Sequence, residues 1–350
     1  LVLGLETSCD ETAVGIVGSD RKIFANCVAT QLEEHAPYGG VVPEIAARAH
    51  LDHLDGMVRR ALDEAGLALE DLAGIAATCG PGLIGGVMVG AMMGKAIAAV
   101  CDLPFIAVNH LEAHALSPRL SHGVAFPYLL LLVSGGHCQI LLARAIGDYR
   151  RLGGTIDDAV GECFDKGAKL LGLGYPGGPL IEQAAQQGDA KAFALPRPLL
   201  GRKGCDFSFS GLKTALRVLV SQTGSTEKSP SFVADAAASL QAAIADILAD
   251  RVQNALHMLK EEGQEITALV VAGGVAANQA IRHRLTALMA PLGLPFIAPP
   301  LALCTDNGAM VAWAGLERLR SGQKDGLDTA ARPRWPLDSS SAVATGAGTR

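Results

Sequence analysis

The chain has 350 residues, of which 49% are hydrophobic and 18% are charged, so it can bury one large core or two of medium size. Its formal net charge of −6 excludes binding of nucleic acid by bulk electrostatic attraction, and any such contact must use a local basic patch or a partner's surface. The 41 glycines of this non-repetitive, apolar chain indicate tight turns and close backbone approaches, as around a phosphate-bearing ligand.

The cysteine pattern indicates a reducing compartment. None of the eight cysteines belongs to a Cys-x-x-Cys pair, and most lie in apolar runs. We therefore expect reduced, mostly buried thiols in a cytoplasmic protein. The printed chain begins with an apolar strand and shows no basic stretch or cleavage site, so no signal peptide is expected.

Residues 1–17, LVLGLETSCDETAVGIV, are predicted to form a β-hairpin of two apolar strands joined by a polar turn. Hydroxyls, backbone amides and the carboxylates of Asp10 and Glu11 gather at its tip. Such a tip suits a phosphate and its cation, and a simple polar turn is the alternative interpretation.

The next segments alternate between helices and strands. Residues 44–65 are predicted to be helical. Residues 72–94 carry no charge over a length that could span a bilayer, but Gly80-Pro81-Gly82 divides them into a short strand and a glycine-rich helix. We therefore expect no membrane span there, and we expect the glycines spaced four apart to let the helix pack closely against a sheet.

The segment His110-Leu111-Glu112-Ala113-His114 is the sharpest local signal. On a helix, residues four apart project from one face, so both imidazoles can bind one metal ion, and neutral imidazoles suit Zn²⁺ or Fe²⁺. Glu112 would point away, which makes it a poor base for a zinc protease. A carboxylate from elsewhere must complete the set, and Asp306 is the best candidate. Solvated helix histidines are the alternative.

Later segments match the earlier ones. Residues 127–143, PYLLLLVSGGHCQILLA, again indicate a hairpin, with Ser134-Gly135-Gly136-His137 at its tip. Residues 74–98 and 268–285 both indicate a strand, a glycine turn and a helix; the second turn runs from Gly273 to Asn278. Related halves predict a duplicated α/β architecture, and coincidence among common α/β units is the alternative.

The C-terminal part is predicted to contain a long helix, or two shorter ones, at 231–260, and a helix at 306–320 that opens with the cap sequence Thr305-Asp306-Asn307. Residues 336–350 are small and polar and are expected to form a poorly ordered tail.

Eight ordered motifs between residues 1 and 335 together resemble the tRNA N6-adenosine threonylcarbamoyltransferase family, in its bacterial branch. They are LETSCDETAVG, HAPYGGVVPEIAARAH, NHLEAHALS, LLLVSGGHCQI, GECFDKGAKLLGLGYPGGP, FSFSGLKTAL, VVAGGVAANQAIR and LCTDNGAM. The resemblance implies the duplicated α/β fold of the actin, sugar-kinase and Hsp70 type, with a nucleotide in the cleft between two lobes. We expect lobe I at 1–123 plus 305–335, and lobe II at 124–304.

The resemblance also assigns site residues. It implies metal ligands at His110, His114 and Asp306, and places Asp10 and Glu11 at the mouth of the cleft, where we assign them a catalytic role. Some members have Asp where Glu182 stands, and either carboxylate can accept hydrogen bonds from a ribose. The implied adenylate contacts, to which we add Gly274 from its glycine turn, are Leu132, Val133, Ser134, Gly135, Gly136, Asp165, Gly178, Glu182, Gly274 and Asn278.

The implied reaction moves a threonylcarbamoyl group from threonylcarbamoyl-adenylate to N6 of adenosine 37, in tRNAs that read codons beginning with A. A separate synthase supplies the adenylate. One divalent metal, Fe²⁺ or Zn²⁺, and a bound adenylate or ATP are the implied cofactors. The implied partners are tRNA, a paralogous inactive subunit and a small ATPase, with no membrane.

Three other functions remain open from the residues. A metalloprotease would use the two histidines, but Glu112 is misplaced for it. A small-molecule kinase of the same fold would not need the histidine pair, and a non-catalytic subunit should lack both the metal ligands and the glycine loops. Because fold does not separate these functions, the site must.

Overall fold

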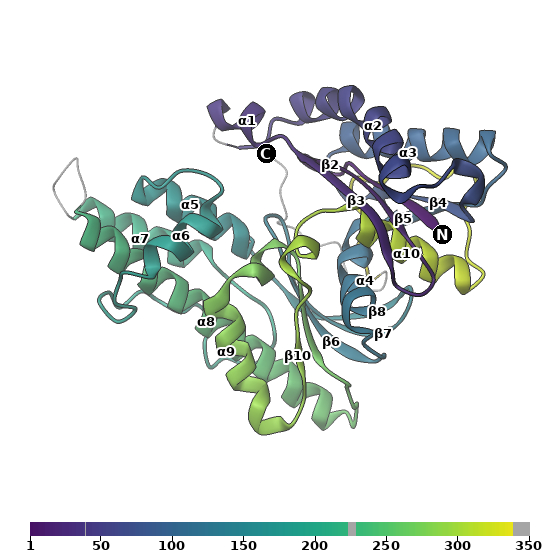
Figure 1. Cartoon of the computed structure of the whole chain (residues 1–350). Coiled ribbons are helices and arrows are strands. Elements are labelled where there is room, and N and C mark those ends of the chain that lie inside the picture. Colours follow the sequence, from purple (N-terminus) through teal and green to yellow (C-terminus); the bar gives the residue numbers. More distant parts are fainter. Residues whose placement is uncertain (39, 223–228, 339–350) are drawn as a thin grey trace. The chain divides into compact units, whose positions relative to one another are not determined.

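The computed structural model describes residues 1–38, 40–222 and 229–338 (Figure 1). The chain divides into two compact units. Unit 1 comprises Leu1–Gly123, Ile146–Asp148 and the described chain from Pro299 onward, and unit 2 comprises Val124–Ala145 and Tyr149–Ala298. Most of the predicted disordered tail, residues 339–350, lies outside the described residues.

Unit 1 is built on a mixed five-stranded sheet in the order β3-β2-β1-β4-β5. Strand β1 pairs with β2 in antiparallel register, with Gly4 opposite Gly15, and with β4 in parallel. The strands are β1 (Val2–Glu6), β2 (Glu11–Val17), β3 (Ile23–Thr30), β4 (Gly74–Gly80) and β5 (Phe105–Asn109).

The side chains of β1 alternate between the two faces of this sheet, as they must in a strand. Leu3 and Leu5 join an apolar cluster with Leu54 of helix α2 and Ala91 of helix α3. Gly4 faces helix α10 instead, where an added Cβ would lie 2.2 Å from the backbone nitrogen of Ala312. Because glycine has no Cβ, the backbone of α10 can lie directly against the strand. The unit 1 helices are α1 (Leu32–His35), α2 (Pro43–Ala65), α3 (Ile84–Val100), α4 (His110–His122) and α10 (Gly308–Arg320).

The predicted division of residues 72–94 is confirmed, because they form β4 and the start of α3. The α3 glycines make the expected close contacts. A Cβ at Gly86 would lie 2.4 Å from the Thr7 carbonyl oxygen, and one at Gly90 would lie 2.4 Å from the Thr7 hydroxyl. The helix therefore packs against the end of β1 and helps to hold the hairpin tip.

Unit 2 repeats the topology of unit 1, with the strand order β10-β9-β6-β7-β8. Strand β6 pairs with β7 in antiparallel register and with β9 in parallel, as β1 does with β2 and β4. The predicted duplication of the hairpin and of the strand–helix unit is confirmed. The strands are β6 (Tyr128–Val133), β7 (Cys138–Ala145), β8 (Asp148–Gly154), β9 (Leu269–Ala272) and β10 (Phe296–Ile297).

One long helix, α8, runs through unit 2 where one or two were predicted. By length and composition alone α8 could cross a membrane, yet 67% of its most apolar window is buried inside the protein, as in a core helix. The unit 2 helices are α5 (Val160–Leu171), α6 (Gly177–Ala185), α7 (Ser210–Ser221), α8 (Pro230–Glu261) and α9 (Gln279–Met289).

Two further sequence predictions can be judged from single elements. All eight cysteines are free and most are buried, as expected. The predicted start of the last helix at Asp306 is wrong: α10 begins at Gly308, because the Asn307 side chain caps it by accepting from the Met310 N–H at 2.9 Å. Asp306 therefore lies before the helix, where its side chain need not follow the helical direction.

Candidate functional site

Helix α4 presents His110 and His114 on one face, as predicted. Asn109 caps the helix by accepting hydrogen bonds from the N–H groups of Leu111 and Glu112, so His110 stands at its first position. The two imidazole rings lie edge to face, with centroids 4.7 Å apart. Glu112 points elsewhere and accepts from the Gly147 N–H and from Arg318.

Asp306 lies against both histidines. Its Oδ1 is 3.0 Å from Nε2 of His114 and 3.6 Å from Nε2 of His110. Tetrahedral ligands about 2.1 Å from one zinc ion would stand about 3.4 Å apart, so these separations match a shared metal ion. The structure thus brings together the three residues that the resemblance named as ligands, and they form a possible metal site.

Glu6 lies behind His110, and the sequence analysis missed it. Its Oε2 is 3.0 Å from Nδ1 of His110 and accepts from the Thr78 hydroxyl at 2.5 Å, while Oε1 accepts from the Ser8 N–H at 2.6 Å. A carboxylate that holds the distant nitrogen of a ligating histidine fixes the ring and its tautomer. The available signal was a charged residue ending an otherwise apolar strand.

This cluster perturbs the ionisation of its members. Burial opposes the charge on His110, but Asp306 and Glu6 outweigh burial and raise the pKa of His110 to about 9. Burial would also raise the pKa of Glu6, yet the charge and hydrogen bond of His110 hold that pKa below its usual value. Glu6 and His110 therefore form a buried ion pair at neutral pH.

The predicted catalytic pair Asp10 and Glu11 belongs to the same electrostatic cluster. Burial, then the neighbouring carboxylates of Asp306 and Asp10, raise the pKa of Glu11 to about 10. Burial and the same two aspartates raise the pKa of the Cys9 thiol. A carboxyl group that resists ionisation because other carboxylates crowd it, as Glu11 does, marks a place where a divalent cation is electrostatically favoured.

The hairpin tip is fixed from two sides. The Thr7 hydroxyl donates to the carbonyl of Gly86 in α3 and accepts from the Gly90 N–H. From α2, the ring of His50 bonds the Thr12 hydroxyl at 2.8 Å and the Cys9 carbonyl at 3.1 Å. The acidic tip is therefore rigidly supported.

His110, His114 and Asp306 offer the nitrogen and oxygen ligands that suit Zn²⁺ or Fe²⁺. Two imidazoles and one carboxylate leave coordination positions for substrate, as in catalytic zinc and iron sites. Nδ1 of His114 is buried and has no hydrogen-bond partner among the described residues, so the Nε2 atom that faces Asp306 is the nitrogen placed to bind metal.

The second hairpin tip, Ser134-Gly135-Gly136-His137 in unit 2, has two glycines at its centre. Within the described residues, the N–H groups of Gly135 and Gly136 have no hydrogen-bond partner, and a Cβ at either position would meet nothing within 4 Å. Ser134 closes the turn: its N–H donates to the His137 carbonyl, and its hydroxyl accepts from the His137 N–H. Leu132 and Val133 precede the tip as fully buried strand residues.

Two other glycines pack against this tip. A Cβ at Gly273, which has φ +94°, would lie 2.3 Å from the Val133 carbonyl oxygen, and one at Gly161 would lie 2.6 Å from the Ser134 carbonyl oxygen. The strand-to-helix turn that contains Gly274 and the start of α5 therefore adjoin the tip. These contacts bring two glycine turns and the glycine at the start of α5 to the same edge of the unit 2 sheet.

The remaining predicted nucleotide residues make defined contacts within unit 2. Asp165 accepts from the Gly177 N–H at 2.7 Å, and Glu182 accepts from the Gln279 N–H at 2.7 Å. Asn278 caps α9, accepting from the Ile281 N–H, and its amide donates to Gln241. Gly178 has open space where a Cβ would be.

Named proteins match this sequence over most of its length. A family profile described as tRNA N6-adenosine threonylcarbamoyltransferase matches residues 22–313. A protein of that name from Paramagnetospirillum magneticum is 59% identical, with 97% of each chain covered. Another, from Sphingopyxis alaskensis, is 60% identical, covering 100% of this chain and 99% of the relative.

Solved structures share the fold at low identity. The (R)-2-hydroxyglutaryl-CoA dehydratase component A of Acidaminococcus fermentans has a TM-score of 0.52 at 15% identity, with 92% of this chain and 99% of that chain covered. HypF of T. kodakarensis has a TM-score of 0.58 at 17% identity, with 92% and 48% covered. The duplicated α/β fold implied by the resemblance is thereby confirmed. The chain belongs to the tRNA N6-adenosine threonylcarbamoyltransferase family, and it is a tRNA-modifying transferase.

Proposed function

We propose that the chain transfers the threonylcarbamoyl group from threonylcarbamoyl-adenylate to N6 of adenosine 37, in tRNAs that read codons beginning with A. In this reaction N6 bonds to the carbamoyl carbon, the bond from that carbon to the phosphate oxygen of AMP breaks, and N6 loses a proton. The observation that carries the proposal is that one chain holds both the His110, His114 and Asp306 cluster, in unit 1, and an open glycine tip, in unit 2. A kinase needs only the glycine tip, which can bind phosphate, and a metalloprotease needs only the metal cluster.

In unit 1, His110, His114 and Asp306 would hold one Fe²⁺ or Zn²⁺ ion, with Glu6 orienting His110. A bound ion of this kind polarises carbonyl oxygens and orients an acyl group. Asp10 and Glu11 lie in the same buried cluster, and we assign to this pair the proton that leaves N6. A carboxylate that lies beside a reacting amine can take the proton that the amine loses.

In unit 2, the free N–H groups of Gly135 and Gly136 would donate to phosphate oxygens of the adenylate. The turn at Gly274 and the N-terminal end of α9 at Asn278 add donors on the same edge of the sheet, where phosphates commonly bind. Asp165 and Glu182 would accept hydrogen bonds from the nucleoside, with Gly178 leaving room for it. Leu132 and Val133 support the tip through their backbone.

The decisive experiment is His110→Ala in a reconstituted reaction with the partner proteins, tRNA, threonine, bicarbonate and ATP. Mass spectrometry of the tRNA nucleosides should show N6-threonylcarbamoyladenosine with the wild-type protein and none with the variant. Calorimetry should show that the variant still binds ATP. His53→Ala, which changes an exposed histidine of α2, is the matched control and should leave the product yield unchanged.

Two results would contradict the proposal. Equal product from His110→Ala and wild type would remove the metal cluster from the reaction. Phosphorylation of a small molecule or cleavage of a peptide by the wild-type protein, without modified tRNA, would replace the function. Elemental analysis of wild type and His114→Ala identifies the metal and tests the ligand set separately.

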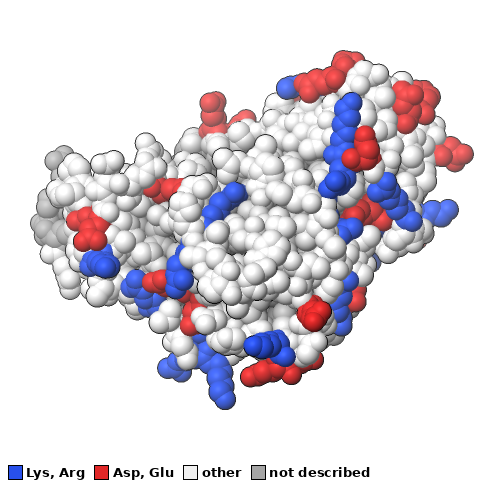
Figure 2. Space-filling model, turned by 60° about the horizontal axis from the view of Figure 1, so that its bottom comes forward, with Lys and Arg blue, Asp and Glu red and all other residues white. Residues whose placement is uncertain are grey.

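We further propose that a paralogous, inactive subunit docks on α3, and that a small ATPase completes the cytoplasmic complex. Exposed apolar side chains recur at every fourth residue in the first part of α3, a spacing that places Ile84, Met88 and Met92 on one face. Contiguous apolar surface of this kind marks protein interfaces. Figure 2 shows basic and acidic side chains interspersed on the face in view, which fits a protein that relies on partners to attract tRNA.

The interface is tested by Met88→Glu, which places a charge in the middle of the apolar stripe. Gel filtration with the paralogous subunit should show loss of the heteromer, while Leu292→Glu, at an exposed apolar residue of unit 2, should leave it intact. A heteromer of undiminished stability with Met88→Glu would place the interface elsewhere.

A further inference from the structure

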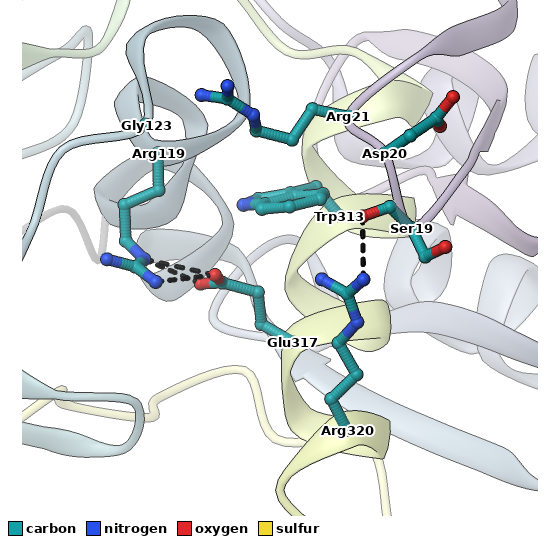
Figure 3. Close-up of a pocket in the computed structure, with 8 residues that line it drawn as sticks. All are labelled: Ser19, Asp20, Arg21, Arg119, Gly123, Trp313, Glu317 and Arg320. Atoms are coloured by element: carbon teal, nitrogen blue, oxygen red, sulfur yellow. Dashed lines mark hydrogen bonds and ion pairs between the residues drawn. The ribbon is translucent and has the colours of Figure 1, made fainter.

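A pocket in unit 1 lies at the other ends of the two helices that lead from the metal cluster. His110 and His114 stand in the first turns of α4, and Asp306 directly precedes α10, whereas this pocket lies where α4 ends and α10 approaches its end. Its volume is about 350 Å³, at the lower end of the range usual for small-molecule sites. It is lined by Ser19, Asp20, Arg21, Arg119, Gly123, Trp313, Glu317 and Arg320 (Figure 3).

The pocket carries more positive than negative side chains. Arg119 and Glu317 satisfy each other through several hydrogen bonds of 2.8 to 3.1 Å. Asp20 accepts from the Lys22 N–H, and Figure 3 shows its carboxylate directed away from the guanidinium of Arg21. Arg21 and Arg320 therefore leave the pocket with an excess of positive charge.

The two remaining arginines have unused donors. Arg320 donates one hydrogen bond, to the Ser19 carbonyl at 2.6 Å, out of the five N–H groups of a guanidinium. The guanidinium of Arg21 has no hydrogen-bond partner in the part of the chain that the structure describes. It occupies the space above Gly123, where a Cβ would lie 2.2 Å from its Nη1. Gly123 thus leaves room for this side chain at the end of α4.

The buried side chain of Trp313 gives a second reason, independent of the arginines, to expect a ligand in this pocket. The residue is only 3% exposed, and its Nε1 is buried without a hydrogen-bond partner among the described residues. Figure 3 shows the nitrogen end of the indole directed toward the space between Arg21 and Arg119. A buried tryptophan N–H normally finds an acceptor, and the pocket supplies donors on both sides of this one.

A purely structural role explains only part of this arrangement. Arg21 beside the C-terminal end of α4 offsets the partial negative charge of the helix carbonyls, and Arg320 ties the β2–β3 turn to α10. Neither contact gives the Trp313 N–H an acceptor. An anion that carries several acceptor oxygens would satisfy the indole and both guanidinium groups together.

We propose that this pocket binds a phosphate group, through the guanidinium groups of Arg21 and Arg320 and the Nε1–H of Trp313. The phosphate belongs either to a free phosphate ester or to the backbone of a bound RNA. The site shares no residue with the metal cluster or with the glycine turns, so it does not depend on the proposed function.

The test uses the two tryptophans of the chain, Trp313 and Trp335. In a Trp335→Phe background Trp313 is the single fluorophore, and its emission is followed while inorganic phosphate or glycerol 3-phosphate replaces chloride at constant ionic strength. We expect a saturable change. Adding Arg21→Ala should weaken the phosphate affinity obtained from this change tenfold or more. Arg59→Ala, at an exposed arginine of α2, should leave that affinity unchanged.

Calorimetry of Trp313→Phe, which keeps a ring but removes the N–H, should show weakened phosphate binding, with circular dichroism confirming the fold. Competition distinguishes the source: if tRNA displaces the phosphate signal, the phosphate is that of the RNA backbone, and if the signal persists in saturating tRNA, it is that of a free ester. Absence of saturable binding, or equal binding by Arg21→Ala, overturns the proposal.

Discussion

The two hairpin tips are the same backbone element with opposite chemistry. In unit 1, four residues, Thr7 to Asp10, join β1 to β2, and in unit 2, Ser134 to His137 join β6 to β7. The first tip is buried, acidic and adjoins the histidines of α4, while the second is open and offers unpaired N–H groups. A duplicated scaffold thus supplies one tip suited to a cation and one suited to an anion.

The comparison extends into the sheets. Counting back from the last rung of each hairpin, the pair Gly4 and Gly15 in unit 1 corresponds to Leu131 and Ile140 in unit 2. The glycine pair lets the backbone of α10 contact the strands, which carries the segment before α10, with Asp306, toward the histidines. The bulky pair in unit 2 fills a core instead. Small side chains at this rung therefore position the metal cluster.

The largest expected effect comes from adding a side chain at Gly4, which would prevent the close contact between β1 and α10. Gly4→Val should lower the free energy of unfolding by about 3 kcal/mol or more, because its side chain would enter the backbone of α10. The matched change, Leu131→Val at the corresponding position of unit 2, should cost about 1 kcal/mol. Urea unfolding measures both, and equal costs would refute the assigned role of the glycine pair.

Glu6→Gln tests the support behind His110. It should weaken metal binding by about 10- to 100-fold, because the amide is a poorer partner for the His110 ring. Competition with a chelator of known affinity gives the dissociation constant of the metal ion. Glu44→Gln, at an exposed acid of α2, should bind metal like wild type; an unaltered constant for Glu6→Gln would assign Glu6 a structural role only.

Gly135→Val tests the open tip of unit 2. The fold should be retained because nothing lies within 4 Å of the new Cβ, while ATP affinity measured by calorimetry should fall about tenfold or more, as the side chain takes the place of a phosphate. Gly56→Val, at another glycine with open surroundings, is the control. Unchanged ATP binding by Gly135→Val would remove this tip from the nucleotide site.

The smallest effect, counted per pH unit, is the pH dependence of metal binding in unit 1. The pKa of His110 is raised from 6.5 to about 9 in the metal-free protein. Its charged form therefore stabilises the fold below about pH 6.5, and this stabilisation is lost as the pH rises through 9. Since the metal must displace that proton, metal affinity should rise by up to about tenfold per pH unit between 7 and 9. Chelator competition at three pH values measures the slope.

Glu6→Gln should flatten this slope at pH 8 to 9, because loss of the neighbouring charge lowers the pKa of His110. A metal affinity independent of pH in both proteins would show that His110 is already neutral before the metal binds.

The sequence alone was enough to predict the histidine pair and the two hairpins. The four-residue spacing of His110 and His114 on a capped helix determines that both rings share a face, and alternating apolar strands around polar or glycine turns determine the two hairpins. Glu6 was missed because a carboxylate at the end of an apolar strand gives no sign of which partner it meets. The start of α10 was misplaced by two residues because Asp306 and Asn307 both have capping side chains, and only the backbone geometry selects Asn307.

The sequence by itself determined the duplicated elements, the histidine pair and the family, because these depend on local spacing and on ordered motifs. Only the tertiary structure decided three sets of contacts. Glu6 bonds His110, which lies 104 residues away in the chain, and Asp306 lies close to both imidazoles. Arg21, Trp313 and Arg320 line one pocket. Such contacts join segments far apart in the chain. They depend on how closely α10 and α4 pack against the strands, and residue spacing carries no information about that distance.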